Sequence, residues 1–221
     1  MSNKETETSN DLKEHWFFKL LMEFMPDPNT IDISGQTPEE MIKSASWIAF
    51  SISTTAGLPP GPIGWATILP EIIALTKLQM NLIAKIAKYY GKEKQLNPTI
   101  IAYIFANEAG IAIGRTIAKR AGSRLIIRSV GPKVLRPIAQ KISARIAARI
   151  TQRALGRWIP FVLAPIFGAY SKHMTTRIGK EADKLCKQEI EIEETILCPN
   201  GHECGKFDKF CSECGAQLNV A

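Results

Sequence analysis

The chain has 221 residues, of which 45% are hydrophobic and 22% are charged, and this balance is typical of a globular protein rather than a disordered one. Its length accommodates one ordinary domain and a small appendage. Residues 1–11 are polar and partly acidic, so we expect no secretory signal and a cytoplasmic protein.

The formal net charge of +7 conceals a strong segregation of charge along the sequence. Residues 109–180 contain fifteen Lys and Arg and no Asp or Glu, so the other residues hold 13 bases and all 21 acids, a balance of −8. A chain with this asymmetry is expected to turn its basic region toward an anionic partner. A solvated basic face without a partner is the plainer alternative.

Residues 1–35 are predicted to form a flexible arm that contains a short amphipathic helix. Asn10 or Asp11 can cap this helix, which ends near Met25 because prolines follow at positions 26 and 28. Its apolar side comprises Trp16, Phe17, Leu20, Leu21 and Phe24.

Residues 36–188 are predicted to form an all-α helical bundle. Thr37 and Glu40 have the spacing of a capping box and Pro38 stands at the first helical position, so a helix begins there and ends near Thr55. Gly91 is the expected left-handed stop of the next helix. The further predicted helices span residues 70–90, 97–121, 138–155 and 160–186. We expect no strand before residue 190, because no earlier segment shows a clear alternation of apolar and polar residues.

Two long stretches of this domain, residues 44–70 and 158–170, carry no charge. The first is long enough to cross a bilayer, but Pro59, Pro60 and Pro62 interrupt it in the middle. A buried helical hairpin is the plainer interpretation of these stretches. A segment that enters the membrane interface is the alternative.

Small residues repeat every fourth position in the predicted helix 97–121. They are Ala106, Gly110, Gly114 and Ala118. On a helix they would form one smooth ridge, and close approach of a neighbouring helix would offset the roughly 1 kcal/mol that each interior glycine costs.

The strongest candidate for contact with an anionic partner is the predicted helix 138–155 with the residues just after it. Its basic residues repeat every fourth position and comprise Lys141, Arg145, Arg149, Arg153 and Arg157. Isoleucines at 138, 142, 146 and 150 would form an apolar ridge beside them, which suits anionic membrane lipids. Nucleic acid is the alternative partner, although no aromatic residue for base stacking lies between Phe105 and Trp158. A third interpretation leaves the isoleucines in the core and the basic residues in water.

Four of the five cysteines lie in the last 24 residues, in a pattern typical of a metal site. Two residues separate Cys211 from Cys214, so one tight turn can aim both thiolates at the same ion, and Cys198 opens the matching half. His202 and Cys204 compete for the fourth position. A segment this short cannot bury a core and needs the metal to fold. Residues 189–221 are therefore predicted to form a linker and a zinc ribbon with one structural zinc ion.

The segments Cys198-Pro199-Asn200-Gly201-His202 and Phe210-Cys211 to Cys214-Gly215 carry a resemblance. They resemble the short zinc ribbons of many bacterial and archaeal proteins, in which CPNGH precedes FCxxCG. This resemblance implies that His202, rather than Cys204, is the fourth ligand.

A second resemblance covers residues 45–185. It rests on GLPPGPIG at 57–64, LPE at 69–71, LQ at 78–79, IAKIAKYYG at 83–91, IP at 159–160 and FGA at 167–169. In these segments the chain is similar to the EcsC family of bacterial helical proteins. The resemblance implies a bacterial protein of the cytosol or the membrane periphery, and it supplies no catalytic residues.

No set of residues combines a nucleophile, a base and an oxyanion hole, so we expect no enzymatic activity. Glu71 falls in the first turn of a predicted helix, where the helix dipole favours a carboxylate, and His173 is isolated in the sequence. The resulting hypothesis is a non-enzymatic zinc-binding adaptor or regulatory protein. It would be peripheral to the bacterial inner membrane through its basic helical domain, with anionic lipids or a membrane protein as partner.

Overall fold

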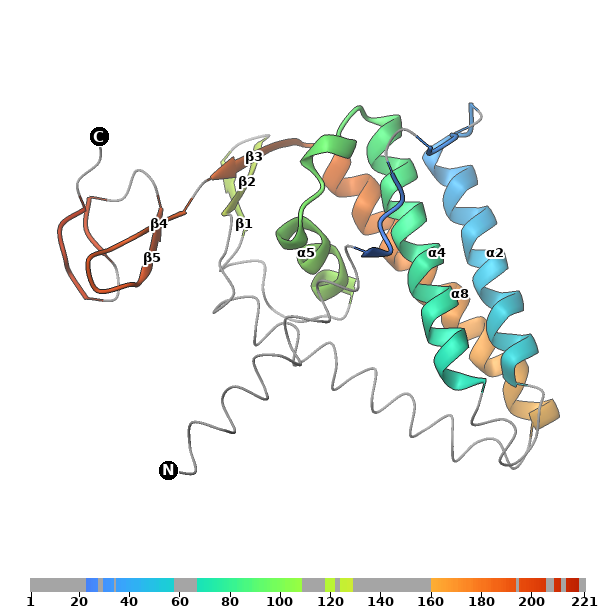
Figure 1. The fold of residues 1–221 in the computed structure, drawn as a ribbon. Coiled ribbons are helices and arrows are strands. Elements are labelled where there is room, and N and C mark those ends of the chain that lie inside the picture. The colour runs from blue at the N-terminus through green and yellow to red at the C-terminus, as the bar shows by residue number, and fades with distance from the viewer. Residues whose placement is uncertain are drawn as a thin grey trace, which may run out of the picture.

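Long helices dominate the fold (Figure 1). The computed structural model describes residues 23–27, 30–33, 35–57, 67–108, 118–121, 124–128, 160–193, 195–205, 209–211 and 214–218. The helices are α2 (Pro38–Gly57), α4 (Ile68–Tyr89), α5 (Pro98–Glu108) and α8 (Pro160–Cys186), with a short 3-10 helix, η1 (Glu93–Gln95). They pack into a helical bundle, which confirms the predicted fold class.

Helix α2 runs antiparallel to α8 along most of its length. Near one end of the pair, the Ser53 hydroxyl donates to Ser171 Oγ at 2.6 Å. Further along, Gly179 of α8 lies so close to Ile42 that a Cβ on the glycine would be 2.6 Å from Ile42 Cγ1. The absence of a side chain at Gly179 is therefore what allows these two helices to approach.

Helix α4 also packs against α8, and it runs in the same direction as α8. The Gln79 side-chain amide donates to Thr175 Oγ1 at 3.3 Å, and the Tyr90 hydroxyl donates to Asp183 Oδ1 at 2.8 Å. Both contacts join buried or half-buried side chains, so they fix the register of α4 against α8.

The helix boundaries follow the predicted signals closely. The Thr37 backbone N–H donates to Glu40 Oε2 at 2.8 Å, and the Glu40 N–H donates to Thr37 Oγ1 at 3.4 Å, which confirms the capping box. Gly91 has φ +67° and confirms the left-handed stop after α4. Helix α2 continues to Gly57, two residues beyond the predicted end, and α4 begins two residues before Pro70.

The main hydrophobic core lies in one half of the bundle. Its largest fully buried side chains come from α4, α5, α8 and strand β2 (Arg124–Arg128). These side chains are Met80, Ile83, Ile86, Ile100, Ile101, Ile104, Ile127 and Ile178. Helix α2 contributes Met41, Ile42 and Ala45 from its first turns.

A three-stranded sheet corrects the prediction that no strand precedes residue 190. Strand β1 (Ala118–Ala121) pairs antiparallel with β2, and β2 pairs parallel with β3 (Glu189–Glu193). The predicted helix 97–121 is thus wrong at its C-terminal end, because pairing with β2 overrides the local helix preference of Ala118–Ala121. Ala118 therefore does not continue a helical ridge of small residues.

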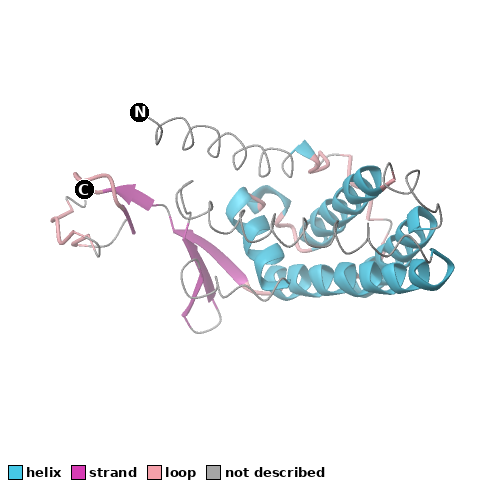
Figure 2. Cartoon of the chain, turned by 90° about the horizontal axis from the view of Figure 1, so that it is seen from below, coloured by secondary structure: helices cyan, strands magenta, loops and turns pink. Residues whose placement is uncertain are grey.

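The segment predicted as a linker is also part of this sheet. Strand β3 aligns with β2 so that Glu189 stands opposite Arg124, Glu191 opposite Ile126 and Glu193 opposite Arg128. Residues 189–193 therefore belong with the main domain, and the tail begins after them. In Figure 2 the sheet lies between the helices and the tail.

Several sequence-based expectations lie outside the described residues. These are the amphipathic helix before residue 23, the predicted helix 138–155, and Gly110 and Gly114 of the small-residue ridge. Within the part of the chain that the structure describes, no helix is long and apolar enough to cross a membrane.

Candidate metal centre

A short hairpin places the first half of the metal centre. Strands β4 (Thr195–Leu197) and β5 (Glu203–Gly205) pair antiparallel, and a tight turn between them begins at Cys198. In this turn the Gly201 N–H donates to Cys198 O at 2.8 Å, and the Cys198 N–H donates to His202 O at 2.9 Å. Gly201 has φ +78°, a conformation that glycine adopts without steric cost.

Cys211 and Cys214 occupy a second turn with the same pattern of hydrogen bonds. The Gly215 N–H donates to Cys211 O at 2.8 Å, and the Cys211 N–H donates to Ala216 O at 2.8 Å. Gly215 has φ +70°. Each half of the centre is therefore a turn that starts at a cysteine and closes on a left-handed glycine.

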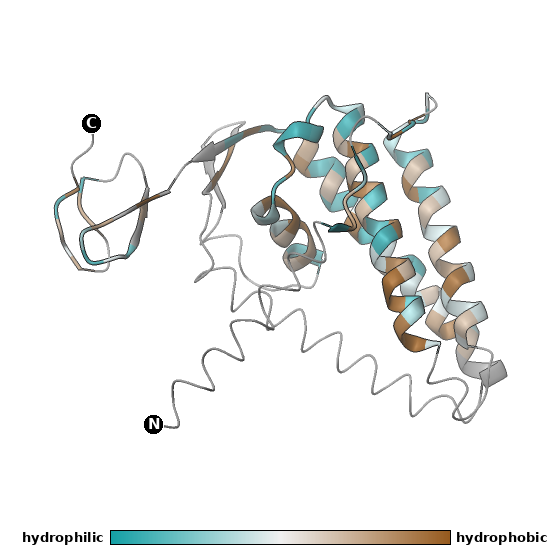
Figure 3. Cartoon of the chain, viewed as in Figure 1, coloured by the Kyte–Doolittle hydropathy of each residue, from teal (hydrophilic) through white to brown (hydrophobic). Residues whose placement is uncertain are grey.

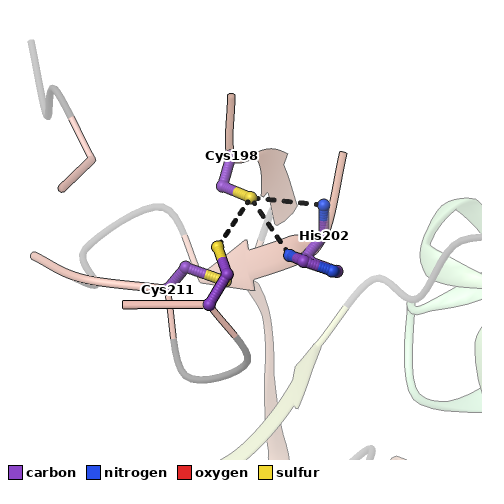
Figure 4. Close-up of side chains that lie close together, drawn as sticks. Cys198, His202 and Cys211 are labelled. Atoms are coloured by element: carbon purple, nitrogen blue, oxygen red, sulfur yellow. Dashed lines mark hydrogen bonds between the residues drawn. The ribbon is translucent and has the colours of Figure 1, made fainter. Parts of the chain in front are cut away.

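The two turns bring four ligand atoms together. The side-chain ligand atoms of Cys198, His202, Cys211 and Cys214 all lie within 4.8 Å of one another, and Figure 4 shows the labelled members of this cluster gathered around one point. Cys198 Sγ lies 3.5 Å from His202 Nδ1 and 3.7 Å from Cys214 Sγ. This cluster could hold a metal ion.

The spacing can be compared with a tetrahedral site. Zinc–sulfur bonds of about 2.3 Å and zinc–nitrogen bonds of about 2.0 Å place sulfur about 3.5 Å from nitrogen and about 3.8 Å from another sulfur. The two distances from Cys198 Sγ match these values. A tetrahedral ion would thus be bound by three sulfurs and by His202 through Nδ1.

The pKa values of the Cys198 and Cys214 thiols are shifted in opposite directions. Burial raises the pKa of Cys198, although the backbone N–H groups of His202 and Asn200 oppose this. The backbone N–H of Ala216 and the Asn200 side chain lower the pKa of Cys214. Because a metal binds thiolates, metal binding releases protons and strengthens as pH rises.

Cys204, the rival of His202 for the fourth position, lies beside the cluster. Its thiol is buried and donates to His202 O at 3.6 Å. Burial, together with the neighbouring Cys211 and Cys198 thiols, raises the pKa of Cys204 to about 12. The four residues whose ligand atoms converge include His202 and do not include Cys204.

Two apolar residues that cover the cluster were missed in the sequence. Leu218 is buried together with the cysteines, and Ile196 packs against this cluster. The sequence offered one signal for them: Ile196 stands two residues before Cys198, and Leu218 stands four residues after Cys214. They pack against the buried cysteines 198, 204 and 211, and an apolar shell of this kind limits the access of water to a metal site.

The other residues considered from the sequence do not assemble a second site. Among the described residues, no other group of three or more His, Cys, Asp and Glu could hold a metal ion. Glu71 and Glu108 are buried in separate helices, and His173 is exposed. Burial raises the pKa of Cys186 to about 11, so this thiol stays protonated.

The residues proposed for anionic contact lie outside the described part of the chain. They are Lys141, Arg145, Arg149, Arg153 and Arg157.

Comparison with protein-family models gave no match, and comparisons with curated proteins and with solved structures gave none either. The resemblances to the EcsC family and to the zinc ribbons therefore stay predictions from the sequence.

Proposed function

We propose that the protein is a non-enzymatic zinc-binding adaptor or regulatory protein. One structural zinc ion would be held by Cys198, His202, Cys211 and Cys214. The observation that supports this assignment is the convergence of these four ligand atoms within 4.8 Å, at spacings that suit a tetrahedral ion. Four protein ligands leave no open position for substrate, so the zinc would hold the tail folded rather than catalyse a reaction.

The proposed place of action is an anionic surface, the inner face of a bacterial membrane. The acid-free region 109–180 supports this proposal, because its fifteen basic residues have no acid among them in the sequence. Strand β3 brings two acids next to this region, since Glu189 and Glu193 align in register with Arg124 and Arg128. The two acids come from outside the acid-free region, and the excess of basic residues in the sequence of 109–180 is unchanged by them.

The metal assignment is tested by replacing the two rival ligands separately and measuring bound zinc and the spectrum of the cobalt-substituted protein. We expect His202→Ala to reduce the zinc content well below one equivalent, and Cys204→Ala to retain one. Cobalt bound to the unaltered protein should show the charge-transfer bands of three thiolates and one imidazole. The reverse pattern of zinc loss would make Cys204 the fourth ligand.

The surface assignment is tested by flotation of the full chain with vesicles of phosphatidylglycerol and phosphatidylcholine, against vesicles of phosphatidylcholine alone. We expect flotation with the anionic vesicles, weakening as salt rises because surface charge is screened. No flotation with anionic vesicles at moderate salt would refute the membrane proposal. Binding to DNA or RNA with a steep salt dependence would instead support the nucleic-acid alternative.

A further inference from the structure

Three helix ends meet at the end of the bundle away from the main core. The Thr67 hydroxyl, just before α4, donates to Ala56 O in the last turn of α2 at 2.9 Å. A Cβ on Gly57 would lie 3.2 Å from Ala164 Cβ, so the end of α2 also touches the start of α8. Figure 1 shows the C-terminal end of α2 and the N-terminal ends of α4 and α8 together.

This end of the bundle is almost free of charge. We define the charge-free end as residues 44–57 of α2, 67–76 at the start of α4 and 160–171 of α8. The only charged residue in these ranges is Glu71, which is 4% exposed. The surface that this end offers to its surroundings therefore carries no charged side chain among the described residues.

Apart from Ala45, the described apolar side chains of the charge-free end are not part of the main core. Among the described residues of its three ranges, only Ala45 belongs to the main core cluster. Among the described residues, five of the seven exposed large hydrophobic side chains lie here. They are Trp47, Ile48, Leu69, Ile166 and Tyr170, and Leu69 and Ile166 are 65% and 56% exposed. Figure 3 shows strongly apolar turns at this end of α4.

A lysine marks the limit of the charge-free end on each of the three helices. The nearest charged residues beyond it are Lys43 on α2, Lys77 on α4 and Lys172 on α8. At about 1.5 Å per residue, they stand about 14–21 Å from the tips of their helices. One leaflet of the hydrocarbon core of a bilayer is about 15 Å thick.

Aromatic side chains lie at the same level as these lysines. Trp47 and Tyr170 each stand ten residues, or about 15 Å, from the tip of their helix. Lys172 Nζ lies 3.3 Å from the centre of the Trp47 ring. Tryptophan and tyrosine prefer the boundary between lipid and water, and lysine there reaches the phosphates.

We propose that the charge-free end inserts into one leaflet of an anionic membrane. Leu69 and Ile166 would enter the acyl region, Trp47 and Tyr170 would lie at the headgroup level, and the three lysines would bind lipid phosphates. This inference rests on the proposed action at a membrane and names the surface that enters it. Three lysines at about 14–21 Å from the helix tips, with no exposed acid nearer the tips in the described residues, are complementary to anionic headgroups.

The test compares vesicle binding of variants at the two ends of the bundle. Leu69→Glu and Ile166→Glu place a carboxylate at the proposed depth, and Tyr89→Glu places one on an exposed aromatic residue at the other end of α4. Leu69 is suited to this change, because it is exposed and in the first turn of α4, where a carboxylate favours the helix. Circular dichroism checks that each variant is folded.

We expect Leu69→Glu and Ile166→Glu each to lower the partition coefficient for anionic vesicles by roughly tenfold or more, since each removes the insertion of a large aliphatic side chain. Tyr89→Glu should lower the partition coefficient by less than about threefold, because it only adds one negative charge to the protein surface. Each lysine-to-glutamine change at 43, 77 or 172 should lower it by roughly fivefold.

A second measurement reports depth directly. With tryptophans 16, 65 and 158 replaced by phenylalanine, lipids brominated near the headgroup end of the acyl chain should quench Trp47 fluorescence. Absence of quenching in vesicles that bind the protein would overturn the insertion.

The outcomes separate the two proposals. If the unaltered chain floats but Leu69→Glu, Ile166→Glu and Tyr89→Glu float equally well, the insertion is wrong and the membrane function stands. If the unaltered chain does not float, the membrane function fails and the insertion fails with it. If Leu69→Glu abolishes self-association in sedimentation without changing flotation, the charge-free end binds a second copy and the insertion is wrong.

Discussion

The helical bundle and the C-terminal tail are held together by different forces. The bundle buries a continuous cluster of aliphatic side chains from four helices and a strand. The buried cluster of the tail consists of Cys198, Cys204, Cys211 and Leu218, so three of its four members are cysteines. Burial of apolar area can stabilise the bundle, whereas the tail has few aliphatic groups and, on the proposed function, a metal would supply most of its stability. The two regions should therefore respond to different perturbations.

Removal of the metal should have the largest effect, and it should be confined to the tail. We expect Cys211→Ala, or a strong chelator, to unfold residues 195–218, because metal binding supplies on the order of 10 kcal/mol to such a site. Hydrogen exchange would show rapid exchange of the Cys198 and Gly215 amides, which are hydrogen-bonded in the turns. The helical circular dichroism signal should stay unchanged.

The matched control for this experiment is Cys186→Ala, which removes the cysteine that lies in α8. It should retain one equivalent of zinc and the slow exchange of the tail. Protection of the tail amides in Cys211→Ala would show that the tail folds without a metal, and the contrast between the two regions would then be lost.

Truncation in the main core should have the next largest effect, and it should be confined to the bundle. Ile86 of α4 is fully buried in the main core, so Ile86→Ala should lower the free energy of unfolding by about 2–5 kcal/mol. Urea unfolding followed by circular dichroism measures this loss. Leu69→Ala, at an exposed position, should change the free energy of unfolding by less than about 0.5 kcal/mol. A fall in zinc content in Ile86→Ala would mean that the tail depends on the bundle.

Local signals in the sequence were sufficient for most of the helices. The capping box of Thr37 and Glu40, the stop at Gly91 and the span of α8 all depend on residues close together in the chain. The same holds for the tail, where each turn is set by a cysteine and a glycine four or fewer residues apart. Spacing was enough to predict a metal site in these turns, but it left His202 and Cys204 open as the fourth ligand, and only the resemblance favoured His202.

The strands could not be predicted in the same way, because their pairing is not local. Strand β2 lies between β1 and a strand that begins some sixty residues later, and parallel pairing leaves no turn signal. One signal was present and was missed. Residues 189–193 read Glu-Ile-Glu-Ile-Glu, a strict alternation typical of a strand, and they were assigned to the linker instead.

Helix contact at the charge-free end offers a smaller test inside the bundle. A Cβ on Gly168 would lie 2.1 Å from Thr54 Oγ1 and 3.0 Å from the Phe50 ring. We expect Gly168→Ala to destabilise the bundle by about 1–3 kcal/mol, because the clash outweighs the better helix propensity of alanine. The measurement is again urea unfolding, with zinc content unchanged.

A compensating change distinguishes this clash from a general effect on the helix. Thr54 Oγ1 is buried and has no hydrogen-bond partner among the described residues, so Thr54→Ala removes the clashing group without breaking a bond that the structure shows. The double variant Thr54→Ala with Gly168→Ala should therefore recover much of the lost stability. Strict additivity of the two changes would show that α2 and α8 are not in close contact here.

The smallest effect should come from the capping box at the start of α2, which lies at the surface. Thr37→Ala removes the hydroxyl that accepts the Glu40 N–H and should lower the free energy of unfolding by about 1 kcal/mol. The same box makes stability depend on pH. Hydrogen bonds from the backbone and side chain of Thr37 lower the pKa of Glu40 below its usual 4.5.

A lowered pKa means that the folded chain favours the charged carboxylate. The stabilisation from Glu40 is therefore present above its unfolded pKa of about 4.5 and is lost as pH falls through the lower folded value. Glu40→Gln keeps a hydrogen-bond acceptor but cannot ionise, so between neutral pH and pH 3 it should lose less stability than the unaltered chain. The comparison requires the bundle transition alone, followed by circular dichroism, because the tail loses metal over the same range as its thiolates are protonated. An equal loss in both proteins would mean that the carboxylate of Glu40 gains nothing from the capping box.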